Sequence, residues 1–119
     1  MNFYDYIYVS KTINIINKIN IMNNNINSLL IQAGEDGNIE EIKYLIEHGE
    51  KHNCKINIHQ DIGYIFIYAC EYGYFEIVKY LLEFGEQHNS KIDINDMEYA
   101  FGHACEHGHI DIVKYLLEY

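Results

Sequence analysis

The stretch that decides the fold runs from Ala69 to Gly85 and reads ACEYGYFEIVKYLLEFG. It returns nearly letter for letter from Ala104 to Tyr119 as ACEHGHIDIVKYLLEY, and in a more diverged form from Ala33 to Gly49 as AGEDGNIEEIKYLIEHG. A glycine marks the same place in each copy, at intervals of 36 and 35 residues: Gly37, Gly73 and Gly108. Self-similarity at a fixed period of this size indicates stacked structural repeats.

Each copy predicts a pair of helices joined at the marker glycine. We expect the first helices near residues 26–36, 62–72 and 97–107, because glycine adopts the left-handed conformation that ends a helix at little cost. In the second helix, Ile77, Val78, Leu81 and Leu82 form one apolar stripe that predicts burial against the first helix. The pattern therefore predicts an all-α solenoid of helix-turn-helix repeats.

Between repeats, the motif Lys-Ile-x-Ile occurs at 55–58 and 91–94, and its alternation predicts a short extended segment with one buried face. The same motif at 18–21 suggests that residues 1–24 are a degenerate partial repeat that keeps a second helix and a loop. A disordered Asn/Ile-rich segment is one alternative, and the helical spacing of Ile15, Ile19, Met22 and Ile26 competes with both. The predicted units are 1–24, 25–60, 61–95 and 96–119.

The charge balance limits the classes of partner. The chain has 18 acidic residues against 8 basic ones, all of them lysine, and a net charge of −10. Such a chain repels phosphate backbones, so we expect no nucleic-acid partner. No apolar run is long enough to cross a membrane and no signal peptide is visible. Cys70 and Cys105 share one repeat position and are expected to be small apolar fillers and not disulfide partners. This suggests a reducing compartment, so we expect the chain in the cytoplasm or nucleus. We also expect a monomer.

The repeated pattern Ala-Cys-Glu-x-Gly-x-x-Glu-Ile-Val-Lys-Tyr-Leu-Leu-Glu resembles the ankyrin repeat, over about residues 26–119. The resemblance implies about three ankyrin-type repeats plus the partial one, a concave binding face, and a structural hydrogen-bonding role for His109. With its Ile/Asn bias, the chain looks similar to short ankyrin-repeat proteins of giant DNA viruses. It departs from the family where Tyr-Ile-Phe-Ile at 64–67 replaces Thr-Pro-Leu-His, and the longer period puts the family's regular finger turn in doubt.

One cluster suggests metal chemistry. His103 and His107 are spaced i,i+4, which lets two imidazoles share a metal on a helix, and Cys105 and His109 lie nearby. The equivalent residues of the other repeats are tyrosines and polar residues that could not chelate. We therefore expect no metal and no cofactor. The chain also lacks nucleophile-elbow, phosphate-loop and zinc-peptidase motifs, so we expect no enzymatic activity.

The leading hypothesis is a protein-binding module with an acidic concave face that favours a basic partner. The candidate partner-binding residues are at positions beside the marker glycines and in the loop tips, outside the repeated glycine and apolar positions. They are Glu35, Asp36, His59, Gln60, Glu71, Tyr72, Asn95, Glu98, Glu106 and His107. The alternative is a truncated or decaying array fragment with no specific ligand. The resemblance also admits an adaptor that recruits host degradation machinery, although no second domain such as an F-box is visible.

Overall fold

The computed structural model describes residues 2–51 and 58–119, and their side chains apart from those at 18–25, 50–51 and 58–59. Within these ranges the chain forms α-helices and no β-strand, which confirms the all-α prediction. The helices are α1 (Phe3–Asp36), α2 (Ile39–Lys51), α3 (Ile58–Tyr72), α4 (Phe75–Gln87), α5 (Ile94–Glu106) and α6 (Ile110–Glu118).

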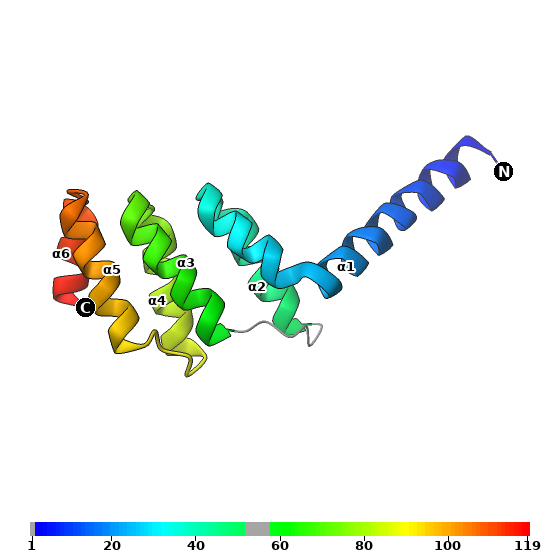
Figure 1. The fold of residues 1–119 in the computed structure, drawn as a ribbon. Coiled ribbons are helices and arrows are strands. Elements are labelled where there is room, and N and C mark those ends of the chain that lie inside the picture. Colours follow the sequence, from blue (N-terminus) through cyan, green and yellow to red (C-terminus); the bar gives the residue numbers. More distant parts are fainter. Residues whose placement is uncertain (1, 52–57) are drawn as a thin grey trace.

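The helices stack as a solenoid. The end of α1, then α3 and α5 lie side by side in one row, and α2, α4 and α6 form a second row behind them (Figure 1). Each first helix contacts its own second helix, and α3 also contacts the first helices on both sides of it, α1 and α5. This arrangement confirms the helical repeat solenoid.

The marker glycines make the turn within each helix pair. Gly37, Gly73 and Gly108 have φ values of 71°, 81° and 73°, in the left-handed region where residues with a Cβ are strained. The amide that follows each glycine donates back to the preceding helix, as from Tyr74 to the Ala69 carbonyl at 2.8 Å. These bonds satisfy carbonyls that would otherwise be unpaired at the helix end.

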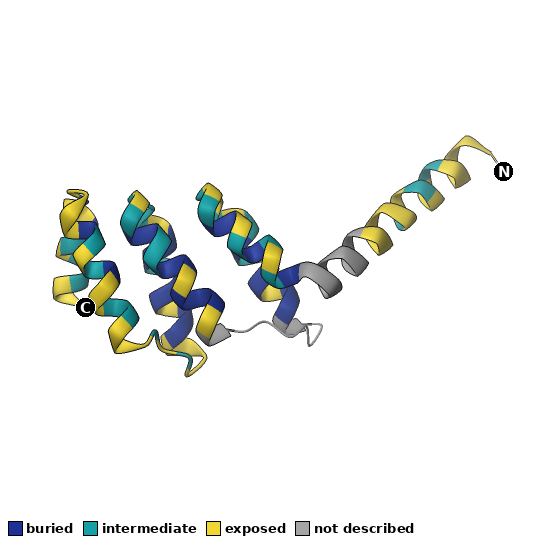
Figure 2. Ribbon diagram, viewed as in Figure 1, coloured by how far each residue is buried: buried dark blue, intermediate teal, exposed yellow. Residues whose placement is uncertain are grey.

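The core lies between the two rows of helices (Figure 2). The predicted stripe of α4 is buried, with Ile77, Val78, Leu81 and Leu82 no more than 3 % exposed. Across from it, Phe66 of α3 is fully buried. The apolar periodicity of the second helices therefore predicted their buried face correctly.

The expected loop near residues 18–21 was wrong, because α1 is one continuous 34-residue helix. Asn2 caps its start by accepting the Asp5 amide proton at 2.8 Å, and no Gly or Pro interrupts the sequence before residue 34. Because no residue in this segment breaks a helix, the helical spacing of the apolar residues predicts the structure better than the Lys-Ile-x-Ile motif at 18–21 does. The N-terminal part of α1 projects from the stack with Phe3 and Tyr4 exposed (Figure 1).

The extended segment between repeats also differs from the prediction. Residues 55–57 lie outside the described part of the chain. In the last copy, Ile92 packs against the core, but Ile94 is 66 % exposed because α5 begins there. The N-cap of α5 is Asp93, whose carboxylate accepts the Asn95 amide proton at 2.8 Å.

The two repeated cysteines differ in burial. Cys70 is fully buried, as expected of an apolar filler, and burial raises the pKa of its thiol to about 12. Cys105 is exposed, so the prediction was wrong there. Both thiols are free.

Asp61, in the first turn of α3, supplies a prediction about stability. It is 7 % exposed, its Oδ2 has no hydrogen-bond partner among the described residues, and burial raises its pKa above the ordinary value of 3.8. The folded chain therefore favours the protonated carboxyl, and this contribution to stability is lost as the pH rises through the raised pKa. At pH 7, Asp61→Asn should increase the free energy of unfolding by about 1 kcal/mol.

Urea unfolding over a pH series from neutral to acidic checks this, since the advantage of the variant should shrink as Asp61 becomes protonated. Asp96→Asn, at the same repeat position but only half-buried, is the control and should change stability by less than about 0.5 kcal/mol. A loss of stability in Asp61→Asn at pH 7 would contradict the prediction.

Candidate functional site

Helix α3 carries a row of exposed and half-buried tyrosine rings. Tyr64, Tyr68 and Tyr72 are spaced four residues apart, which places them on one side of the helix, and Tyr74 follows the marker glycine. Successive ring centroids lie 5.0, 5.2 and 6.1 Å apart. Tyr64 and Tyr72 are 40 % and 53 % exposed.

Helix α5 carries the equivalent row with histidines in three of the four places. Tyr99, His103, His107 and His109 follow one another with ring centroids 4.5, 6.0 and 6.2 Å apart. Tyr99 is 60 % exposed and His107 is also exposed. We call these eight rings, which lie on α3 and α5 and directly after their C-terminal ends, the ring ladder. In the first repeat the same positions are polar: Ser28, Gln32, Asp36 and Asn38.

The ladder's last ring in each repeat ties that repeat to the one before it. Tyr74 donates its hydroxyl to the Glu35 carbonyl at 3.2 Å. His109 Nε2 lies 2.7 Å from the Glu71 carbonyl, and because a carbonyl can only accept, this nitrogen carries the proton. The hydrogen-bonding role expected of His109 is confirmed, and tyrosine performs it in the preceding repeat.

Two phenols of the ladder, those of Tyr68 and Tyr72, have raised pKa values. The hydrogen bond with Tyr64 and the proximity of that phenol raise the pKa of Tyr68 to about 12. The negative charge of Glu71 raises the pKa of Tyr72. Both hydroxyls are therefore hydrogen-bond donors at neutral pH.

Lysine is absent from the first-helix segments. Residues 26–36, 58–72 and 94–106 contain none of the chain's eight basic residues, which lie in the N-terminal part of α1, in the second helices and in the connecting segments. The same segments carry acidic residues near the ladder, including Glu35, Glu71 and Glu106. The side of the stack that presents the ladder, which we call the first-helix face, thus lacks cationic side chains along these segments.

The predicted partner-binding residues fall into two groups. One group lies at the C-terminal ends of the first helices, beside the ladder: Glu35, Asp36, Glu71, Tyr72, Glu106 and His107. The other group lies at the N-terminal ends of α3 and α5, where Gln60, Asn95 and Glu98 are exposed and the side chain of His59 is outside the described set. The structure does not bring the two groups into one site.

Sequence reasoning missed part of the surface. Tyr68, Tyr99 and His103 were not among the candidates, although all three belong to the ladder. The four-residue spacing of aromatic residues along each first helix was the available signal.

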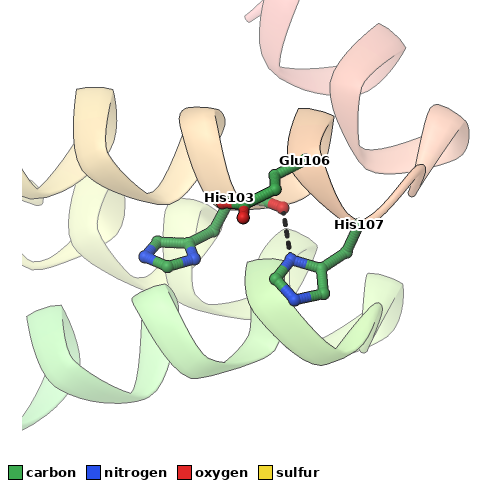
Figure 3. A group of neighbouring side chains, drawn as sticks. All are labelled: His103, Glu106 and His107. Atoms are coloured by element: carbon green, nitrogen blue, oxygen red, sulfur yellow. Dashed lines mark hydrogen bonds between the residues drawn. The ribbon is translucent and has the colours of Figure 1, made fainter.

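One group of ligand-type side chains gathers among the described residues. One donor atom each of His103, Glu106 and His107 lies within 4.8 Å of the others (Figure 3). Cys105 and His109, which the sequence placed in the same cluster, are outside this group. No described helix is long and apolar enough to span a membrane.

A family model for ankyrin repeats matches the chain in overlapping segments, at residues 7–98 and 67–119. Comparison with curated proteins and with solved structures found no match. The family match covers most of the chain and agrees with the stacked helix pairs, the left-handed glycines and the bonds of Tyr74 and His109 between repeats. The chain therefore belongs to the ankyrin-repeat family, whose repeats generally serve as protein–protein interaction modules.

Proposed function

We propose that this chain is a non-enzymatic protein-binding module whose partner docks on the first-helix face. The observation that carries the proposal is the ring ladder, because it exposes tyrosine and histidine rings side by side on two neighbouring helices. Tyrosine supplies a large, stiff contact area with a polar tip, and such residues often dominate the binding energy of protein interfaces.

The partner that fits this face is basic. A lysine or arginine side chain can lie over a tyrosine ring, which attracts cations, while Glu35, Glu71 and Glu106 supply carboxylates nearby. The face offers no lysine along residues 26–36, 58–72 and 94–106 to repel it. Electrostatic attraction of this kind accelerates association and weakens with added salt.

We further propose a biological setting. The Ile/Asn-rich composition is typical of translation from an AT-rich genome and supports a viral factor that engages a host protein. Such a factor would act as a monomer in the cytoplasm or nucleus of the host cell. The free cysteines agree with a reducing compartment.

A site-specific photocrosslinker tests the docking face. Placed at Tyr72, it should capture a discrete partner from lysate, and the yield should fall as salt is raised from about 50 to 500 mM, because the Debye length shrinks. Tyr72→Ser combined with His107→Ser should weaken binding of the captured partner by at least about tenfold, as expected for interface anchors.

The matched control places the crosslinker at Tyr44 of α2, which is 44 % exposed on the other row of helices. Its companion variant, Tyr44→Ser with His88→Ser, removes the same residue types and should leave binding unchanged. Equal capture at both positions, or equal losses in both variants at unchanged melting temperature, would exclude the first-helix face as the docking site.

A second candidate, an array fragment without a specific ligand, is supported by an apolar groove of about 420 Å³ beside α5 and α6. It is lined by Ile94, Met97, Phe101, Leu116, Leu117 and Tyr119, together with Glu98. The equivalent residues Ile62, Phe66, Leu81 and Leu82 are buried by the following repeat. This candidate predicts concentration-dependent association in sedimentation velocity and no discrete crosslinked partner.

A further inference from the structure

We propose that His103, Glu106 and His107 form a surface site for a divalent transition-metal ion, with Zn²⁺ as the representative ion. His103 and Glu106 lie in the last turn of α5 and His107 is its C-cap, so the spacing i, i+3 and i+4 places the three on one side of the helix end. Imidazole nitrogens and a carboxylate oxygen are ligands that suit Zn²⁺. The site shares His103 and His107 with the ring ladder, but the proposal does not depend on protein docking because it concerns metal binding by the chain alone.

The geometry brings the donors near coordination distance. The three ligand atoms lie within 4.8 Å of one another, and the two imidazole rings are 6.0 Å apart with planes 27° from parallel. Ligands of a tetrahedral zinc stand about 2.0–2.1 Å from the ion and therefore about 3.4 Å from one another. Glu106 and His107 are exposed, so small side-chain rotations can close the remaining gap.

A hydrogen bond orients one ligand. His107 Nδ1 lies 3.0 Å from the backbone carbonyl of His103 (Figure 3), so it carries the proton and leaves Nε2 with a free lone pair. A carbonyl that holds the second ring nitrogen is the usual support of a metal-binding histidine. Nδ1 of His103 is buried and has no hydrogen-bond partner among the described residues, so no hydrogen bond of this nitrogen has to break if the ring turns toward an ion.

The local electrostatics favour a cation. His103, Glu106 and His107 lie at the C-terminal end of α5, where the helix dipole places partial negative charge. The chain has a net charge of −10. Three protein ligands leave a fourth position for water or for a group of another molecule, which makes this an open site.

The comparison between repeats does not exclude the site. The equivalent residues in α3 are Tyr68, Glu71 and Tyr72, so the carboxylate recurs while the two imidazoles are replaced by phenols. This difference shows that the scaffold does not need a metal. It also supplies a test, because two substitutions recreate the ligand set in α3.

Isothermal titration of the EDTA-treated and dialysed chain with ZnCl₂ tests the proposal. We expect one ion per chain and at least about tenfold weaker binding in His103→Gln and in His107→Gln, since each removes a ligand. Glu106→Gln should weaken binding less. The matched control His88→Gln removes an exposed histidine outside the group and should bind as the unaltered chain, while circular dichroism verifies that all variants fold.

The double variant Tyr68→His with Tyr72→His should raise the stoichiometry to two ions, and a stoichiometry that stays at one would overturn the argument from spacing. Unchanged affinity in the double variant His103→Gln with His107→Gln would place the ion elsewhere, for example at His52, Cys54 or His59, and would overturn the site. Absence of binding up to about 1 mM Zn²⁺ would overturn it as well.

Discussion

Gly73→Ala should lower the free energy of unfolding by roughly 2–4 kcal/mol, from backbone strain and a steric clash together. At φ 81° an L-residue is strained, whatever its surroundings. A Cβ at this position would also lie 2.7 Å from Cε1 and Nδ1 of His109, whose ring packs on the glycine. Relieving that clash moves the ring and breaks its bond to the Glu71 carbonyl. Urea unfolding followed by circular dichroism measures the change.

Two glycines of the last repeat separate the contributions. Gly108 has a φ of 73° but nothing within 4 Å of an added Cβ, so Gly108→Ala should show the backbone strain alone, about 1–2 kcal/mol. Gly102 lies within α5 with open space around it, so Gly102→Ala should stabilise by about 0.5–1 kcal/mol through helix propensity. Equal effects of the changes at Gly73 and Gly108 would show that the contact with His109 adds nothing.

Phe66→Ala should destabilise the chain by about 3–5 kcal/mol, the largest effect expected of any single side chain here. Phe66 is fully buried at the centre of the stack, and it is the bulkiest of the fully buried side chains. Its removal loses apolar burial and leaves a cavity that rigid neighbouring helices fill only partly. Because small domains have total stabilities of about 5–15 kcal/mol, the unfolding midpoint in urea should fall sharply.

Phe101→Ala is the matched control, since Phe101 has the same place in the next repeat but is only half-buried and lines the apolar groove. Phe101 buries less apolar surface on folding than Phe66 does. We therefore expect its removal to lower the free energy of unfolding by less than half as much, or about 1–2 kcal/mol. A larger loss at Phe101 than at Phe66 would contradict the burial order of the two repeats.

The sequence by itself determined the repeat unit. The marker glycines and the stripe of Ile77, Val78, Leu81 and Leu82 are local signals. Each depends on backbone conformation or on helical period, so it can be read without knowing the neighbours. The two-helix repeat was predicted on these grounds, whereas the structural role of His109 was implied by the resemblance to the ankyrin repeat.

Tertiary structure decided which of the repeated residues are buried. Cys70 and Cys105 have the same place in the sequence pattern, but one is buried and the other exposed. The same holds for Phe66 and Phe101, because burial depends on whether another repeat packs over the position. The continuous α1 helix, by contrast, agrees with a sequence signal, because more than thirty residues without a helix breaker outweigh a four-residue resemblance to the connecting segment.

The candidate site, too, was predicted only in part from the sequence. The sequence identified Tyr72 and His107 as variable positions. Tyr68, Tyr99 and His103 share their four-residue spacing, but the distances between the rings are set by the folded helices. Likewise, the i,i+4 spacing suggested that two imidazoles could meet, whereas only the folded chain set Glu106 beside them and left Cys105 out. Spacing fixes which side of a helix a residue occupies, but the distance between ligand atoms depends on side-chain rotamers and on what the neighbouring helix covers.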